Sequence, residues 1–302
     1  MTSSPTVQPQ TMPASRLATF MADIKISHTI FAMPFALLST FLAANGWPHA
    51  EQIGLIILCM IAARTAAMAA NRLLDAPLDV ANPRTKNRAI PGGKLSTTYV
   101  RTAALLSAGA FIAATSLFKF VYHNPWPLYL SVPVIAYLCA YPFLKRFTSL
   151  CHYYLGVALA LAPICAWIAI RGQLQMPPVW MALAVASWTA GFDIIYACQD
   201  YQSDVEQGIF SVPSRIGIPA ALWVARLTHL FSFAMLLQVG FSAHAQLRLF
   251  YFIGVGITGL LLLIEHYLVQ PDDLSKVGMA FFTINGFISL ILGILGIVDV
   301  VR

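Results

Sequence analysis

The sequence predicts an all-α, polytopic membrane protein, a bundle of nine transmembrane helices. Of the 302 residues, 59% are hydrophobic and only 10% are charged, a balance too apolar for an ordinary soluble domain. The apolar residues also form continuous runs of roughly 18–25 residues, and a helix of that length spans the hydrocarbon core of a bilayer. A membrane barrel would show short segments of alternating polarity instead, so the continuous runs favour helices.

The nine predicted spans follow one another along the chain. They cover residues 27–45, 53–73, 99–121, 126–144, 153–170, 178–199, 218–240, 247–269 and 277–300. Residues 1–14 are rich in Ser, Thr, Pro and Gln and lack an apolar core, which is not the pattern of a cleaved signal peptide. We therefore predict a disordered cytoplasmic tail over residues 1–21 and one membrane domain over residues 22–302.

Basic residues are concentrated in alternate loops, which predicts the topology. The two strongly basic loops follow the second and fourth spans and contain Arg84, Lys86, Arg88, Lys94, Lys145 and Arg146. By the positive-inside rule these loops face the cytoplasm, and nine spans then place Arg302 outside. The net charge of +6 is thus explained by topology and anion binding. Because no basic helix or aromatic reading platform is present, nucleic acid is not an expected partner.

The first polar cluster lies at the inner end of the second span. Asn71, Asp75 and Asp79 are spaced four residues apart, which places their side chains on one helical face. Carboxylates are costly near a bilayer, and their oxygens suit Mg²⁺, which is commonly held by a few carboxylates together with substrate phosphates. Pro77 lies between the two aspartates and has no N–H to donate, so we expect the helix to break or kink there and Asp79 to sit on a non-helical turn.

The second polar cluster lies at the inner end of the sixth span. Asp200 and Asp204 follow Asp193 by seven and eleven residues, which keeps the three within a narrow stripe of a continuous helix flanked by Tyr196. Asp193 should lie about two turns, ~10 Å, deeper than Asp200. The two clusters therefore look like two halves of one cation site, which indicates an enzyme that uses a diphosphate within the membrane.

Two features near these clusters each leave two interpretations open. The cations beside the carboxylates either bind a polyanion that also contacts Mg²⁺, or serve only as the topology signal with acidic neighbours as salt-bridge partners. Arg64 precedes Asn71 by seven residues and lies deeper on the same face, where an arginine needs a partner. That partner is either Asp193, in a structural ion pair, or the carboxylate of a substrate below the metals.

Three stretches of this chain carry a family resemblance. They are NRLLDAPLDVANPRTKNRAIPGGKLS from Asn71, YPFLKRFT from Tyr141, and FDIIYACQDYQSDVEQGIFSVPSRIG from Phe192. Together they resemble the UbiA superfamily of intramembrane aromatic prenyltransferases, and the resemblance extends over about residues 22–301. They are similar to its bacterial 4-hydroxybenzoate polyprenyltransferase-like branch. One departure is the sequence YQS inside the second motif, where the ubiquinone enzymes often have charged residues.

The resemblance implies a helical bundle around a central cavity whose polar cap faces the cytoplasm from the bacterial inner membrane. It implies two Mg²⁺ ions that bridge the diphosphate of an isoprenoid donor. Their expected ligands are Asn71, Asp75, Asp79, Asp200 and Asp204. The residues expected to bind the diphosphate are Arg88, Lys145, Arg215 and, from the same loop as Arg88, Lys86. The expected catalytic and acceptor-binding residues are Arg64, for a carboxylate, and Asp193, near a phenolic oxygen, with Tyr196 beside them.

The expected reaction is Mg²⁺-dependent transfer of a polyprenyl group from its diphosphate to an aromatic hydroxy acid of the 4-hydroxybenzoate type, in respiratory quinone biosynthesis. The alternative acceptor is a dihydroxynaphthoate, in menaquinone biosynthesis by the futalosine route. Both are flat phenolic acids that Arg64 and Asp193 can hold. Expected partners are these substrates and membrane lipid, and no protein partner is evident.

Three other classes of protein fit the sequence less well. A CDP-alcohol phosphotransferase needs Asp-Gly and Ala-Arg steps in one tight motif, which this chain lacks. A secondary transporter could use intramembrane Asp and Arg, but it would place them at the midplane and not at one surface. A membrane scaffold without catalytic activity would not explain the metal-like spacing of the carboxylates.

Overall fold

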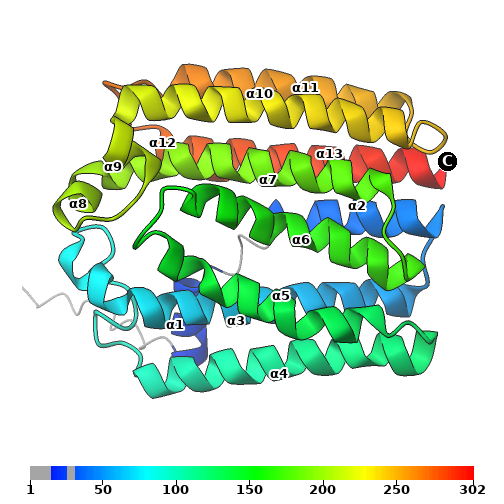
Figure 1. The fold of residues 1–302 in the computed structure, drawn as a ribbon, viewed down its shortest axis with the longest axis horizontal. Coiled ribbons are helices and arrows are strands. Elements are labelled where there is room, and N and C mark those ends of the chain that lie inside the picture. Colours follow the sequence, from blue (N-terminus) through cyan, green and yellow to red (C-terminus); the bar gives the residue numbers. More distant parts are fainter. Residues whose placement is uncertain (1–14, 26–30) are drawn as a thin grey trace, which may run out of the picture.

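The described residues, 15–25 and 31–302 of the computed structural model, are almost entirely helical. Within these ranges the only strand-like feature is one isolated antiparallel bridge between Gln270 and Asp273. The long helices run side by side as a bundle (Figure 1). The all-α prediction is therefore confirmed.

Eight helical segments in the described residues are long and apolar enough to cross a membrane, which confirms a polytopic membrane protein. Their helices are α3 (Ala50–Ala81), α4 (Thr97–Tyr122), α5 (Trp126–Leu144), α6 (Cys151–Arg171), α7 (Met176–Ala197), α10 (Ile218–Ser242), α11 (Leu249–Leu268) and α13 (Asn285–Val301). Two of these segments include shorter helices. The α7 segment continues through the 3-10 turn η2 (Cys198–Asp200) into α8 (Tyr201–Glu206), and α13 is preceded by α12 (Val277–Met279) and the π-helix η3 (Ala280–Ile284).

The first predicted span, 27–45, starts within residues that lie outside the described ranges. Its described part is the shorter apolar helix α2 (Met33–Ala44), which packs between α6 and α13. The Ser39 hydroxyl donates a hydrogen bond to the Pro163 carbonyl of α6 at 2.6 Å. On the other side, a Cβ at Gly293 of α13 would come within 2.5 Å of Pro34. This close packing at small residues gives α2 a ninth position in the bundle.

Helix α7 is the most deeply buried of the candidate spans in the described chain, and it positions Asp193 inside the bundle. Its neighbours are α6 and α10. An added Cβ at Gly156 of α6 would lie 2.1 Å from the Ala186 carbonyl oxygen of α7, so these two helices are in backbone contact. On the opposite face, Gly191 of α7 makes room for the His229 ring of α10.

The expectation of a helix break at Pro77 is wrong. Helix α3 continues through Pro77 to Ala81, so Asp79 is helical. A proline inside a helix costs about 3 kcal/mol, because one backbone hydrogen bond is lost and the ring crowds the preceding turn. Contacts from later loops offset that cost at the end of α3. The Arg146 guanidinium donates to the Leu74 carbonyl at 2.6 Å, and the Thr85 hydroxyl donates to the Asp79 carbonyl at 3.2 Å.

Two further expectations need correction at this end of the bundle. The helix that carries Asp193, Asp200 and Asp204 is not uniform, because the 3-10 turn η2 (Cys198–Asp200) tightens it up to and including Asp200. Helix α1 (Arg16–Asp23) also begins within the predicted disordered tail, residues 1–21, and the Ser15 hydroxyl caps it by accepting from the Ala18 N–H at 3.1 Å. Residues 1–14 of that tail lie outside the described ranges.

One end of the bundle carries the short helices α8 and α9 (Val212–Ile216), and we call it the cap end (Figure 1). Helix α1 lies in the half of the bundle nearer the cap end, and the C-terminus lies at the opposite end (Figure 1). The connections that carry the basic loops, residues 82–96 and 145–150, belong to the cap end.

The contact between α6 and α7 gives a first prediction. Gly156→Ala should lower the free energy of unfolding by about 1–3 kcal/mol, because the new methyl group meets a backbone carbonyl that cannot move without shifting α7. Gly109→Ala is the matched control, since a Cβ at this helical glycine of α4 meets nothing within 4 Å. Thermal melting of the two variants in detergent measures the difference. Equal melting temperatures would contradict the close α6–α7 contact.

Candidate active site

A cavity of about 460 Å³ lies inside the bundle, between α3, α4, α5, α6 and α7. Polar residues line the part near the cap end, and apolar residues line the part farther from it. Every predicted site residue lines this cavity except Lys86 and Arg215. The structure therefore brings the two acidic clusters, Arg64, Asp193 and Tyr196 to one space.

In the first cluster, two carboxylates each bind a cation from a loop. Lys145 Nζ lies 2.6 Å from Asp75 Oδ2. Arg88 Nη1 donates to both carboxylate oxygens of Asp79, at 2.7 and 3.0 Å. Both aspartates are buried, with 3% and 5% of their surface exposed. The other oxygen of Asp75, Oδ1, is buried and has no hydrogen-bond partner in the described chain.

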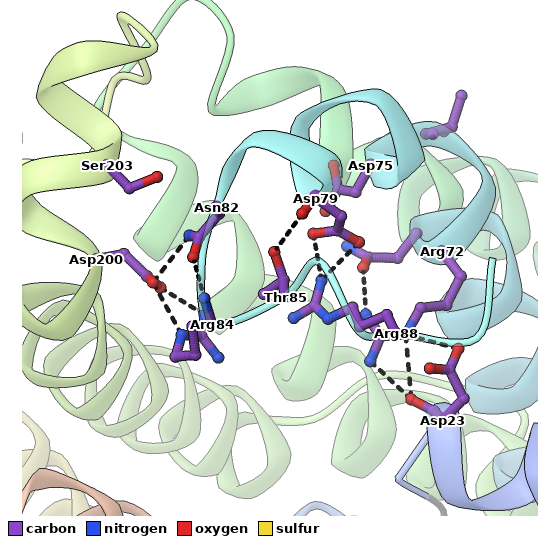
Figure 2. Close-up of polar contacts among 12 residues, drawn as sticks. Asp23, Arg72, Asp75, Asp79, Asn82, Arg84, Thr85, Arg88, Asp200 and Ser203 are labelled. Atoms are coloured by element: carbon purple, nitrogen blue, oxygen red, sulfur yellow. Dashed lines mark hydrogen bonds and ion pairs between the residues drawn. The ribbon is translucent and has the colours of Figure 1, made fainter. Parts of the chain in front are cut away.

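In the second cluster, Asp200 is held by the loop that follows α3, as Figure 2 shows. Arg84 binds it with both arms, Nε to Oδ1 at 2.8 Å and Nη2 to Oδ2 at 2.5 Å. The Asn82 amide adds a hydrogen bond to Oδ1 at 3.0 Å. A third nitrogen of Arg84 donates to the Tyr196 hydroxyl at 3.1 Å. Partial burial alone would lower the pKa of Arg84, but the bonds and charge of Asp200 outweigh it and raise that pKa.

The loop after α3 is therefore the link between the two acidic clusters. Its Arg88 returns to Asp79 and its Arg84 crosses to Asp200 (Figure 2). The sequence shows four basic residues in this loop but gives no period that would identify those pointing inward. Arg84 was therefore not among the expected site residues, whereas Lys86, which was expected, is exposed and does not line the cavity.

Arg215 is the second predicted residue that the structure does not bring to the cavity. Its side chain is exposed on α9, where the guanidinium lies over the Phe210 ring, 3.6 Å from the centroid. Other cations that spacing did not identify do line the cavity. Arg72 is buried and lies 3.2 Å from Asp23, and Lys25 is half-buried nearby. Burial, and then the charges of Arg72 and other arginines, lower the pKa of Lys25.

The oxygen atoms of the two clusters are of the kind that binds Mg²⁺, but they do not form a compact group. Carboxylate and amide oxygens of both clusters line the cavity, and the unpartnered Oδ1 of Asp75 is an available hard ligand. In the described chain, however, no three acidic, His or Cys side chains lie close enough together to hold one ion. Asp75, Asp79 and Asp200 are instead each paired with a cation of their own.

Deeper in the cavity, Asp193 and Arg64 are not paired with each other. His152 Nδ1 lies 2.7 Å from Asp193 Oδ2. Arg64 Nη2 donates to the Lys25 carbonyl at 2.9 Å, and Arg64 Nε is buried without a partner in the described chain. The structural ion pair between Arg64 and Asp193 is therefore absent. Sequence reasoning missed His152, because a single histidine at the start of an apolar helix gives no periodic or spacing signal.

With this geometry established, comparisons with known proteins identify the family. Residues 32–291 match the UbiA prenyltransferase family. The chain belongs to this family. It is 30% identical over 248 residues to a 4-hydroxybenzoate octaprenyltransferase of Vibrio atlanticus, covering 82% of this chain and 84% of that protein. It is likewise 30% identical over 246 residues to the enzyme of that name from Methylobacillus flagellatus, covering 81% and 80%.

Solved structures of UbiA homologues share the fold. The apo structure of a UbiA homologue from Aeropyrum pernix K1 aligns with a TM-score of 0.81 at 26% identity, covering 91% of this chain and 98% of that one. A homologue from Archaeoglobus fulgidus, solved with DMAPP and Mg²⁺, aligns with a TM-score of 0.63 at 15% identity, covering 91% and 99%. At that lower identity the likeness concerns the fold alone.

The protein is thus a UbiA-family prenyltransferase of the membrane, similar to the 4-hydroxybenzoate enzymes. Family membership supports an enzyme over the transporter and scaffold alternatives. It also agrees with the geometry, since both Asp-containing motifs of this UbiA enzyme open onto one cavity at the cap end.

The contrast between two cations of one loop gives a prediction for this enzyme. Arg84→Ala should lower kcat/KM for prenyl transfer on the order of tenfold or more, a loss of about 1.4 kcal/mol or more of transition-state stabilisation. Lys86→Ala, two residues away and outside the cavity, should change it less than about twofold. Steady-state kinetics of the purified variants measure both. Equal losses would mean that the loop acts only through its net charge.

Proposed function

We propose that this protein transfers a polyprenyl group from a polyprenyl diphosphate to an aromatic hydroxy acid of the 4-hydroxybenzoate type. The main supporting observation is the composition of one cavity: paired carboxylates and cations at the cap end, Arg64 and Asp193 below them, and an apolar region beyond. The names of the two Vibrio and Methylobacillus relatives support the same acceptor class.

At the cap end, the proposed role of the charged residues is to hold the donor diphosphate. Asn71, Asp75, Asp79, Asp200 and Asp204 would hold Mg²⁺. When bound, that ion would neutralise charge on the diphosphate and so favour its departure. The cations Lys145, Arg88 and Arg84 already lie beside these carboxylates. Ammonium and guanidinium groups bind phosphate oxygens well, so the same three side chains would stabilise the charge that builds on the departing diphosphate.

The apolar part of the cavity suits the prenyl tail. It is lined by side chains of α3, α4, α5 and α6, among them Ile56, Phe111, Phe118, Val134 and Ala166. None of these side chains has a polar atom that could hold a water molecule by a hydrogen bond. A hydrocarbon tail buried there would also keep water from the allylic carbon, where a carbocation would otherwise be quenched.

Between these two parts lie the groups proposed to hold the acceptor. The unpartnered Nε of Arg64 is available for a carboxylate, and Asp193 can accept a hydrogen bond or a proton from a phenolic hydroxyl, which raises the nucleophilicity of the ring. Three aromatic side chains of the cavity wall, Phe192, Tyr196 and Phe281, can face a cationic prenyl group with their π surfaces.

The second candidate acceptor is a dihydroxynaphthoate. The residues between Asp200 and Asp204 are Tyr201, Gln202 and Ser203, whereas ubiquinone enzymes often have charged residues there. Because of this departure, the dihydroxynaphthoate should be tested as well. Purified enzyme should be given each acid with a set of prenyl diphosphates, and products should be identified by mass. A prenylated hydroxybenzoate supports the first acceptor and a prenylated naphthoate the second. No product from either acid would contradict the proposed function.

We also propose that the cap end faces the cytoplasm of a bacterium from the inner membrane, because the basic loops lie there. Cysteine labelling of the intact membrane tests this orientation. Single cysteines at Arg88 and Gly208 should be accessible from the cytoplasmic side and one at His244 from the other side. Labelling of Arg88 and Gly208 from opposite sides would contradict the single site.

Removal of a proposed metal ligand should stop transfer. Asp75→Ala, Asp79→Ala, Asp200→Ala and Asp204→Ala should each reduce turnover about 100-fold or more while the protein still inserts, since each takes away a charged ligand or its hydrogen bonds. Asp272→Ala, an exposed acidic residue outside the cavity, is the control. EDTA should abolish activity and Mg²⁺ restore it. Near-normal turnover in two of the four variants would contradict the metal assignment.

The role of Arg64 predicts a selective effect on the acceptor. Arg64→Ala should lower kcat/KM for the acid about 10- to 100-fold and leave KM for the prenyl diphosphate nearly unchanged, because the lost group lies below the metal ligands. Arg64→Lys should recover only part of the loss, since an ammonium cannot form two parallel bonds to a carboxylate. Unchanged acceptor kinetics in a folded Arg64→Ala would remove this residue from the site.

A further inference from the structure

His152 is a cavity residue to which neither sequence motif assigns a role. It is the second residue of α6, and only 3% of its surface is exposed. Its two ring nitrogens are both engaged. Nδ1 lies 2.7 Å from Asp193 Oδ2 on α7, and Nε2 lies 3.1 Å from the backbone nitrogen of Val212 at the start of α9. The ring therefore joins three helices at the level of the proposed acceptor site.

The contact with Val212 determines which nitrogen carries the proton. A backbone N–H can only donate, so Nε2 must offer a lone pair and cannot be protonated. The single ring proton then resides on Nδ1 and points at Asp193 Oδ2. His152 is thus a neutral donor to Asp193, with its ring plane held from both ends.

The contact with His152 leaves half of the Asp193 carboxylate available. Oδ2 is taken by the ring, whereas no described residue donates a hydrogen bond to Oδ1. The Asp193 side chain retains 15% exposure and lines the cavity. Arg64, the cation that the sequence suggested as a partner of Asp193, instead donates to the Lys25 carbonyl. Asp193 is therefore fixed through one oxygen by an uncharged group.

We propose that His152 is a positioning residue: it holds Asp193 so that Oδ1 accepts the hydrogen bond of the aromatic acceptor's hydroxyl. This inference rests on the proposed function and deepens it. His152 does not touch the acceptor; it acts through Asp193. Without the ring, the carboxylate would rotate about its side-chain bonds, and the productive orientation would be one of several.

The test compares two variants whose side chains share a branched shape and the same number of heavy atoms, His152→Leu and His152→Asn. Both lose the acceptor for the Val212 N–H, but only Asn has an amide nitrogen near the position of Nδ1 that can donate to Asp193. His152→Leu should lower kcat/KM for the acid on the order of 10- to 100-fold, as the loss of a positioned acid–base group does. His152→Asn should recover most of it, and KM for the prenyl diphosphate should stay constant in both.

Two further variants separate positioning from general loss of structure. His229→Asn replaces another histidine, 2% exposed and bonded to the Trp188 carbonyl of α7, that does not line the cavity. It should reduce thermal stability without changing acceptor kinetics. In an Asp193→Asn background, His152→Leu should add less than about twofold, because the two residues act as one unit.

Each other outcome overturns the proposal. Equal kinetic losses in His152→Leu and His152→Asn would mean that the His152 ring acts by holding α9 in place through Val212, and not by positioning Asp193. A folded His152→Leu with unchanged acceptor kinetics, or a full additional loss in the Asp193→Asn background, would separate His152 from Asp193. If both His152 variants fail to fold, the ring is structural. Wild-type enzyme that transfers no prenyl group to any acid contradicts the proposed function instead, and that experiment precedes the others.

Discussion

Charge pairing inside an apolar bundle is the constraint on which the cap end depends. A carboxylate removed from water is costly unless a cation or hydrogen bonds compensate it. Asp75, Asp79 and Asp200 are each compensated by a cation that comes from a loop and not from a neighbouring span. The irregular segment after α3 therefore folds where it does because Arg84 and Arg88 must reach two different carboxylates.

The same pairing explains how a UbiA enzyme can be stable and still bind a polyanion. The proposed donor would bring phosphate oxygens for the cations, and Asp75, Asp79 and Asp200 would hold Mg²⁺. Each group of an opened ion pair would therefore again face an opposite charge. The net cost of opening a pair is small under these conditions, because neither charge becomes buried alone. A site built from apolar residues would be equally stable, but it could not make this exchange.

The sequence predicted the features that follow a helical repeat, and it missed those that depend on how one loop or one side chain is oriented. The long apolar runs and the four-residue spacing of Asn71 and Asp75 follow from helical geometry, so the spans and the clustering were predictable. The helix through Pro77 was not, because contacts from distant loops outweigh the local penalty. The distinction between Arg84 and Lys86 depends on loop conformation, for which the sequence has no period. The role of His152 depends on the rotation of α6 against α7.

The cavity uses two different kinds of partner for its acidic groups, and the difference is chemical. At the cap end, full cations neutralise the carboxylates. Deeper in the bundle, Asp193 is held by a ring whose other nitrogen accepts the Val212 N–H, so its partner is neutral. A lysine or arginine there would cancel the charge of Asp193 and weaken it as a hydrogen-bond acceptor. A neutral donor fixes the geometry of Asp193 and preserves its charge, which suits a group proposed to activate a phenol.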